Sequence, residues 1–314
     1  MKRLISLLLI AVLSLSIFTS CGDTEAFADV TTDVAEYTYT SDAEEEPEAT
    51  TSEEEETESV GLYIYDNTAV VEAYKSGDTS ALEIDDLLIY MAAVDAIAEF
   101  YTEGMSDDEI ALAAHDYITT RVTYDMDEFN LIGSAIAESS TPFGALIFGE
   151  AICMGYTTTF QLFMDMLGVE SMIVTGSSDG EDHAWNMICV DDKWYHIDCT
   201  WDDFVPDYEG RRPFHTYFMV TDGVIGLEHI WDTESTPVAD SEDYVYFFTH
   251  DCYAETTEEL QAILEAETKD GDLRAEVAMP LDADLGYPTL STASIYAYWR
   301  MDFESYSVVI YYLE

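Results

Sequence analysis

The chain has 314 residues, of which 48% are hydrophobic, so it can form one sizeable globular core and a smaller unit. Its charge is strongly one-sided, because 66 Asp and Glu face 10 Lys and Arg and give a formal net charge of −56 at pH 7. This negative field repels phosphates, so we expect no nucleic acid partner and no attraction to acidic membrane surfaces.

The first twenty residues have the features of an export signal. Lys2 and Arg3 precede an apolar run from Leu4 to Phe18, and small residues follow it. This order is typical of a secretory signal peptide at residues 1–20 rather than of a spanning helix. The segment ends at Cys21 and resembles the lipobox of bacterial lipoproteins, which implies lipidation of Cys21 and attachment to the outer face of the cell membrane. Ordinary cleavage near the same position is the alternative.

Residues 21–60 are predicted to be an acidic, disordered tether. The stretch 22–59 holds fifteen acidic residues and no Lys or Arg. It cannot bury enough apolar surface to fold, and its charges repel one another and extend the chain. We expect this tether to hold the extracellular part of the protein away from the membrane.

Helical patterns follow a short N-terminal stretch of the folded part. Residues 61–75 are predicted to form a short strand and a turn, whereas residues 82–100 have a helical apolar repeat. Ser106 and Glu109 have the spacing of a capping box. They predict a second helix that runs to about Val122.

Cys153 is predicted to lie in the first turn of a buried helix. Apolar residues recur at helical spacing from Tyr156 to Leu167, and Gly168 ends the pattern. The positive end of a helix dipole stabilises a thiolate. The backbone N–H of Cys153 could also face an oxyanion that develops during a reaction.

A hairpin is predicted to supply an imidazole and a carboxylate. Residues 183–190 and 193–201 read as two strands joined by a two-residue turn at Asp191-Asp192. In that register His183 and Asp198 share one face as diagonal neighbours, roughly 7–8 Å apart at the backbone. A thiol becomes a nucleophile when a base removes its proton and a third group orients the base, so Cys153, His183 and Asp198 are the candidate catalytic residues.

The same register argues against Cys189 and Cys199 as the nucleophile. Cys199 points away from the face that carries Asp198, and Cys189 lies six residues along the strand from His183, roughly 20 Å away. Both are interpreted as small core residues.

Among the other histidines, His196 is the one rival base, since it shares the face of Asp198. We favour His183, because His196 lies further from the expected start of the Cys153 helix. His115 is interpreted as structural. His215 could line the cleft, but it is interpreted as a core or surface residue.

The last part of the chain is predicted to be a small α+β module at residues 241–314. A strand at residues 214–220 precedes it. The module's predicted elements are strands at 244–248, 274–279 and 306–313 and a helix that Thr256 caps and that ends near Glu267. No internal repeat, phosphate-binding loop or zinc-type cysteine pair occurs in the sequence, so we expect neither a cofactor nor a metal.

The central motifs resemble the transglutaminase-like superfamily. The matching segments are Thr141-Pro142-Phe143-Gly144-Ala145-Leu146, Ala151-Ile152-Cys153-Met154-Gly155-Tyr156, His183-Ala184-Trp185-Asn186 and Trp194-Tyr195-His196-Ile197-Asp198-Cys199-Thr200-Trp201-Asp202-Asp203. The resemblance covers roughly residues 100–235. It implies an α+β fold in which helices pack on an antiparallel sheet, with a papain-like triad of Cys153 as nucleophile, His183 as base and Asp198 as orienter. Met154 stands where many members carry Glu or Gln, a difference that leaves the triad intact and bears on the pocket beside it.

The predicted organisation is therefore a catalytic domain with N-terminal helices at residues 61–240, followed by the module. The resemblance implies acyl transfer from an amide through a thioester at Cys153. With water as acceptor the enzyme would be a peptidase or amidase that acts on protein or cell-wall peptide, and with an amine it would be a cross-linking transglutaminase. A non-catalytic surface binding module is the third alternative. Hydrolysis is favoured, because water is abundant at a cell surface and the sequence indicates no tunnel that would exclude it.

Overall fold

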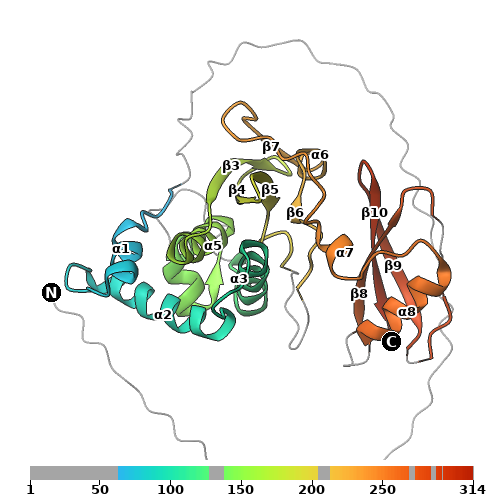
Figure 1. Cartoon of the computed structure of the whole chain (residues 1–314), viewed down its shortest axis with the longest axis horizontal. Helices are drawn as coiled ribbons and strands as arrows, with labels where there is room; N and C mark the ends of the chain where they lie inside the picture. The colour runs from blue at the N-terminus through green and yellow to red at the C-terminus, as the bar shows by residue number, and fades with distance from the viewer. Residues whose placement is uncertain are drawn as a thin grey trace, which may run out of the picture. The chain divides into compact units, whose positions relative to one another are not determined.

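The computed structural model describes residues 63–126, 138–203, 213–268, 273–283, 288–291 and 293–313 (Figure 1). All of them belong to one compact unit, residues Glu58–Glu314. The predicted signal peptide, Cys21 and the predicted acidic tether lie outside the described residues, which begin at residue 63, and stay predictions. Within the described ranges, no helix has both the length and the apolar character needed to cross a membrane.

The fold is a mixed α+β arrangement in which helices pack on an antiparallel sheet, as predicted. The five-stranded sheet has the order β6-β5-β4-β3-β7, and every neighbouring pair is antiparallel. Its strands are β3 (Ser171–Ser178), β4 (Glu181–Val190), β5 (Lys193–Ile197), β6 (Phe218–Val220) and β7 (His229–Trp231). The helices around it are α1 (Thr68–Ser76), α2 (Ile84–Phe100), α3 (Asp107–Arg121) and α5 (Cys153–Leu167).

Short elements connect these helices to the sheet. A parallel two-stranded pair and two single helical turns precede α5. They are β1 (Thr123–Tyr124), β2 (Glu150–Ala151), η1 (Glu138–Ser140) and η2 (Gly144–Phe148), and a further short helix, α6 (Asp222–Ile225), lies between β6 and β7.

Both faces of the central sheet are covered, which explains why β4 is buried along most of its length. On one face, Ile188 and Val190 join a core with the helices, including Phe163 of α5. On the other face, Trp185 and Met187 pack in a second core that also contains residues of the C-terminal strands. Alternate side chains of one strand therefore serve two different cores.

The C-terminal part forms a separate small antiparallel sheet with the order β8-β10-β9. Its elements are α7 (Tyr246–Thr249), α8 (Thr257–Glu267), β8 (Arg274–Pro280), β9 (Ile295–Asp302) and β10 (Tyr306–Leu313). The predicted strands at 274–279 and 306–313 and the capped helix are confirmed, and the capping box of Thr256 and Glu259 is present. The sequence analysis missed β9.

Two local predictions are wrong because short segments took a different conformation. Residues 68–76 form helix α1, not a strand, since Val70, Val71 and Ala73 are buried together and Gly77 ends the helix in a left-handed conformation. Residues 246–249 likewise form the single helical turn α7 instead of a strand. Only the last three residues of the predicted strand at 214–220 are extended in the sheet.

The remaining helix predictions are confirmed. Helix α2 covers the apolar repeat at 82–100, and α3 begins after Ser106 with its capping box formed. The backbone N–H of Ser106 donates to the Glu109 carboxylate at 2.9 Å. These segments are long and strongly patterned, so local signals were enough to place them.

Gly176 marks the place where β7 approaches β3 most closely. A Cβ atom at Gly176 would overlap the carbonyl oxygen of Ile230 in β7, which is backbone and cannot move aside cheaply. We expect Gly176→Ala to lower the free energy of unfolding by about 2–3 kcal/mol, because strain of this kind forces the two strands apart. Urea unfolding followed by circular dichroism measures this loss.

The matched control is Ser177→Ala, one residue along the same strand, where the change makes the side chain smaller. An equal loss of stability in both variants would contradict the role given to Gly176.

Candidate active site

Cys153 is the first residue of α5, as the sequence predicted. Ile152 before it is extended, and its N–H donates to the carbonyl oxygen of Ser139 at 3.0 Å. A Cβ atom at Gly155 would overlap that same carbonyl oxygen, so only glycine fits this approach. Cys153 is 6% exposed, which places its sulfur just below the surface at the start of a buried helix.

Helix α5 is fastened to the strand that carries His183. The hydroxyl of Thr157 donates to the carbonyl oxygen of Ala184 at 2.8 Å. The side-chain amide of Asn186 donates to the carbonyl oxygen of Thr157 at 3.2 Å. These two bonds fix the helix start against β4 and so fix the thiol against the imidazole.

The hairpin forms in the predicted register but ends earlier than predicted. Val190 pairs with Lys193, and both turn residues have positive φ (52° at Asp191 and 63° at Asp192), as a two-residue hairpin turn of this kind requires. The ladder stops at Ile197, so the second strand does not extend to residue 201.

Asp198 begins a turn instead of continuing the strand. Its Oδ1 accepts the N–H groups of Thr200 at 2.9 Å and Trp201 at 3.2 Å. Aspartate side chains often bond the backbone two residues ahead in this way and so compete with strand formation. The turn keeps Oδ1 occupied and leaves Oδ2 to face the imidazoles.

The three predicted catalytic residues, Cys153, His183 and Asp198, lie close together in the structure. Nε2 of His183 lies 2.7 Å from Oδ2 of Asp198. The thiol of Cys153 lies close enough to the ring of His183 to raise its pKa. Since Nε2 is engaged by the carboxylate, Nδ1 is the nitrogen left for the thiol. All three residues are buried, with 6%, 6% and 1% exposure for Cys153, His183 and Asp198.

The charges of the pair stabilise each other. Burial lowers the pKa of His183, but the charge and hydrogen bond of Asp198, with the nearby thiol of Cys153, outweigh it and raise that pKa to about 10. Burial likewise raises the pKa of Asp198, and the two neighbouring imidazoles hold it well below its usual range. The stable state is therefore an imidazolium paired with a carboxylate.

A second imidazole on Asp198 was missed by the sequence analysis. Nε2 of His229 lies 2.9 Å from the same Oδ2 that contacts His183, and His229 is 2% exposed. Its Nδ1 is buried without a hydrogen-bond partner. His229 comes from β7, which joins the sheet by pairing with β3, so no local spacing connected it to the site.

Aromatic rings enclose the imidazole. The ring of Trp185 stacks on that of His183 with centroids 5.8 Å apart, and Trp201 approaches its edge at 6.4 Å. Trp185 also contacts His229, with centroids 4.9 Å apart. This packing limits the motion of His183 and keeps water from the Asp198 side of its ring.

The rival base is engaged elsewhere. Nδ1 of His196 accepts the indole N–H of Trp185 at 2.9 Å, and its Nε2 lies 2.9 Å from Asp222. Burial lowers the pKa of His196, with the carboxylate opposing it only in part. Both ring nitrogens are occupied, so His196 is not placed to take a proton from Cys153.

The other thiols in the described part of the chain have core environments. Burial raises the pKa of Cys199 strongly and that of Cys189 as well. Cys199 is 3% exposed and belongs to the helical core, and Cys252 lies in the second core. Among the described thiols, that of Cys153 is set apart by its effect on the pKa of a histidine.

Among the described residues, two groups of histidine and aspartate side chains lie close enough together to bind a metal ion. One is His183, Asp198 and His229, and the other is His115, Asp116 and His215. The first group differs from the second in that a thiol, that of Cys153, lies beside one of its imidazoles. His183 and Asp198, 2.7 Å apart, have the arrangement of a base and its orienting group, so we retain the prediction that Asp198 orients His183.

Comparisons with known proteins agree with the resemblance in the motifs. Residues 95–199 match the model of the Transglutaminase-like superfamily, which is about a third of the chain and includes Cys153, His183 and Asp198. No curated protein matches the sequence.

Two solved structures are similar over part of the chain. One is described as the crystal structure of a TGase, with 22% identity and a TM-score of 0.32, and covers 45% of this chain and 39% of its own. The other is a putative cysteine protease from Cytophaga hutchinsonii, with 17% identity and a TM-score of 0.29, and covers 38% of this chain and 43% of its own. The chain thus matches less than half the length of either structure. Its residues 95–199 are similar to the transglutaminase-like core.

The His183–Asp198 pair should make stability depend on pH. Because the folded-state pKa of His183 is raised above its usual 6.5, its contribution is complete below about pH 6.5 and is lost as pH rises towards 10. We expect the pair to contribute on the order of 3–5 kcal/mol to the fall in the free energy of unfolding over this window, and Asp198→Asn to remove this contribution, while His215, whose pKa is raised to about 9, keeps its own. Urea titrations at several pH values measure it.

Asp222→Asn is the matched control, since it removes the carboxylate beside His196, whose pKa is lowered. Its stability should keep the wild-type slope above pH 7. A slope that is unchanged in Asp198→Asn would contradict the pairing.

Proposed function

We propose that the protein is a thiol enzyme that transfers the acyl group of an amide through a thioester at Cys153. The observation that carries this is the pairing of His183 with Asp198 at 2.7 Å, with the thiol of Cys153 close enough to raise the pKa of His183. Cys153 is the nucleophile, His183 is the base and then the acid, and Asp198 is the positioning residue. A nucleophile, a base and an orienting group in hydrogen-bond reach are the usual signature of such catalysis.

The proposed first step forms the thioester. The proton that Cys153 gives up is held on His183, whose raised pKa favours the imidazolium form. The sulfur attacks the amide carbon, and the N–H of Cys153 at the start of α5 donates to the oxyanion. The imidazolium then gives its proton to the leaving nitrogen, the carbon–nitrogen bond breaks, and an amine departs.

The second step decides between the two enzyme classes. If His183 takes a proton from water, the hydroxide attacks the thioester carbon, the carbon–sulfur bond breaks, and an acid is released while the Cys153 sulfur regains its proton from His183, which is hydrolysis. If a primary amine attacks instead, a new amide forms, which is transglutamination. We propose hydrolysis of protein or cell-wall peptide, because water is abundant at a cell surface and the sequence indicates no tunnel that would exclude it from the thioester.

Charge supports a preference for cationic substrates. The strand that carries His183 begins with the exposed residues Glu181 and Asp182, and the whole chain carries −56. Such a field concentrates positively charged peptides and repels acidic ones, and salt weakens both effects. Peptides with Lys or Arg near the scissile bond are therefore the proposed substrates.

The location of the enzyme is part of the same proposal. The signal-like segment that ends at Cys21 supports a lipid-anchored protein on the outer face of the cell membrane. At least two acyl chains would be needed there, since one chain binds a membrane only marginally. Mass spectrometry of the mature N-terminus tests this part, and an unmodified N-terminus would remove it.

Cys153 should be the thiol that reacts with an iodoacetamide probe near neutral pH. Cys153→Ala should lose labelling and all turnover while keeping its circular dichroism spectrum, because the alanine removes only the sulfur. Peptide mapping by mass spectrometry identifies the labelled site. Cys189→Ala is the matched control and should keep both labelling and turnover.

Labelling that follows Cys189 or Cys199 would contradict the assignment. A folded protein in which Cys153 reacts but no peptide is turned over would support the alternative of a non-catalytic binding module.

The reaction class is tested by offering a glutamine-containing peptide together with a labelled primary amine. We expect cleavage or deamidation to exceed amine incorporation, and basic peptides to be turned over faster than acidic ones at low salt. Mass spectrometry of the products measures both reactions at once. Amine incorporation without hydrolysis would establish the transglutaminase alternative, and faster turnover of acidic peptides would contradict the electrostatic part.

A further inference from the structure

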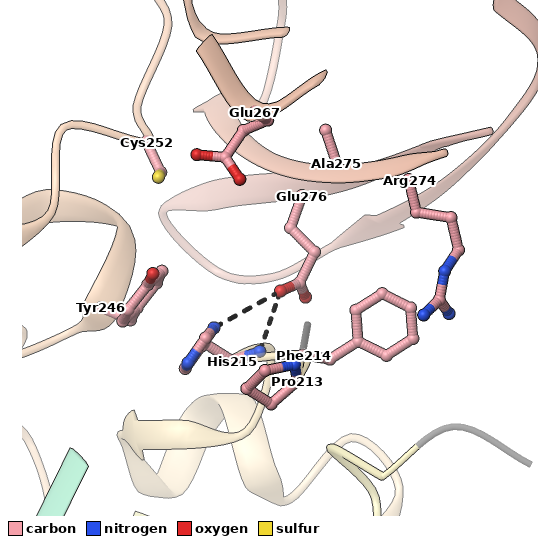
Figure 2. A pocket seen from close by; sticks show the side chains of 9 residues that line it. All are labelled: Pro213, Phe214, His215, Tyr246, Cys252, Glu267, Arg274, Ala275 and Glu276. Carbon is pink, nitrogen blue, oxygen red and sulfur yellow. Dashed lines mark hydrogen bonds and ion pairs between the residues drawn. The ribbon is translucent and has the colours of Figure 1, made fainter. Parts of the chain in front are cut away.

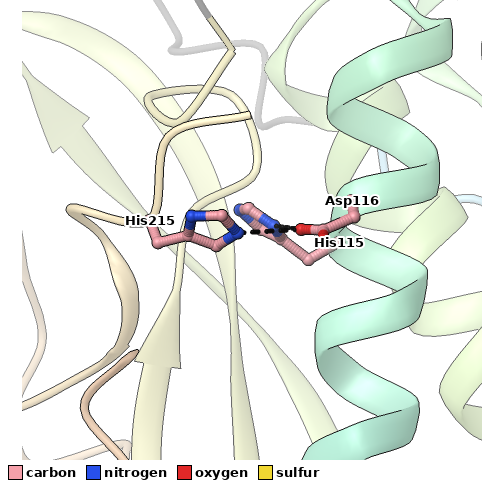
Figure 3. Close-up of side chains that lie close together, drawn as sticks. All are labelled: His115, Asp116 and His215. Atoms are coloured by element: carbon pink, nitrogen blue, oxygen red, sulfur yellow. Dashed lines mark hydrogen bonds and ion pairs between the residues drawn. The ribbon is translucent and has the colours of Figure 1, made fainter. Parts of the chain in front are cut away.

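A second cluster of histidines and carboxylates lies outside the candidate active site. His115 and Asp116 project from α3, and His215 projects towards them from the segment that leads into β6 (Figure 3). Oδ1 of Asp116 lies 3.0 Å from Nδ1 of His115 and 3.0 Å from Nε2 of His215. The three potential ligand atoms lie within 4.8 Å of one another.

Each imidazole has a further carboxylate behind it. Nε2 of His115 lies 3.1 Å from Oδ2 of Asp202. Nδ1 of His215 lies 3.7 Å from Oε2 of Glu276, which also accepts the backbone N–H of His215 at 2.9 Å. Histidines that bind metals commonly place their second nitrogen against a carboxylate in this manner, which fixes the ring and its tautomer.

The imidazole and carboxylate groups of this cluster, and the distances between them, suit a metal ion with tetrahedral coordination. Zinc binds imidazole nitrogen and carboxylate oxygen at about 2.0–2.1 Å, so tetrahedral ligand atoms lie about 3.3 Å apart. The two 3.0 Å separations at Asp116 are close to this value. His115 is fully buried and His215 is 6% exposed, so the imidazoles are held in place by packing.

Three protein ligands leave one coordination position of a tetrahedral ion open, and solvent can reach this cluster. The side chain of Asp116 is 41% exposed, although both imidazoles that it contacts are buried. His215 also lines a cavity of about 50 Å³ together with Tyr246 and Glu276 (Figure 2). A water molecule fits such a volume.

We propose that His115, Asp116 and His215 bind one divalent transition metal ion, with zinc as the best fit, and that water completes its coordination. Nδ1 of His115, Oδ1 of Asp116 and Nε2 of His215 are the ligand atoms. Asp202 and Glu276 orient the two rings. This proposal does not depend on the chemistry of Cys153.

The ion would connect three parts of the fold. Two ligands come from α3 and one from the segment before β6, while Glu276 belongs to β8 of the C-terminal sheet. The ring of Tyr246 stacks on His215 with centroids 3.7 Å apart and an interplanar angle of 6°. The metal would therefore stabilise the contact between the helical core and the C-terminal sheet, which makes it a structural ion.

Zinc binding to the intact chain tests the proposal. The protein is treated with a chelator, freed of it, and titrated with zinc in a calorimeter, with millimolar magnesium present to occupy surface carboxylates. Cys153→Ala serves as the starting protein, so that this thiol cannot bind zinc. We expect one zinc ion per chain and a melting temperature that rises until one equivalent is bound.

Three variants locate the ion. Asp116→Asn keeps the shape of the side chain, and His215→Phe keeps the stack on Tyr246, and each should lose the bound ion. Asp202→Asn should weaken binding by about 10–100-fold, as loss of an orienting group does. His229→Gln, in the other cluster, is the matched control and should bind zinc as tightly as the starting protein.

Each other outcome overturns the proposal. Absence of zinc binding would show a cluster held by hydrogen bonds alone. Equal binding in all variants would place zinc on surface acids, and loss only in His229→Gln would place it at the other cluster. If a variant fails to fold, the spectrum of cobalt(II) bound to the starting protein decides, and the absence of tetrahedral cobalt bands would reject the site.

Discussion

The structure depends on one buried charge, the carboxylate of Asp198. It is 1% exposed, yet two imidazoles and two backbone N–H groups satisfy it. A buried charge that loses its partners costs about 3–5 kcal/mol, so the elements that supply those partners cannot shift independently. The hairpin, the turn after it and the edge strand β7 are thereby held in one arrangement.

Helix α5 meets this arrangement at its first residue. The glycine at position 155 allows the backbone of Ser139 to approach, and Thr157 bonds the strand that carries His183. Further along, the hydroxyl of Tyr156 donates to Asp203 at 2.5 Å, just after the Asp198 turn. The position of the Cys153 thiol is therefore set by packing and hydrogen bonds on every side of the helix start, which is the pre-organisation that nucleophilic catalysis needs.

The described part of the chain contains two clusters of the same type, each with one carboxylate and two imidazoles. In both clusters a carboxylate lies between two imidazoles, and in both at least one imidazole comes from a distant part of the chain. The first cluster includes a histidine that also reaches a thiol, which suits proton transfer. The second has carboxylates behind both rings and an exposed edge at Asp116, which suits an ion. The chemistry of each cluster follows from what surrounds it, since the residue types are nearly the same.

The sequence by itself determined the elements whose signals are local. Helical periodicity and Gly168 fixed the helix of Cys153, and alternation with the Asp191-Asp192 turn fixed the hairpin register that brings His183 to Asp198. Tertiary structure alone decided the rest. His229 reaches Asp198 only because β7 pairs with β3, and residues 68–76 became a helix through burial against the core. Pairing between distant strands and burial of short segments depend on contacts that no local pattern encodes, which is why only the folded chain shows them.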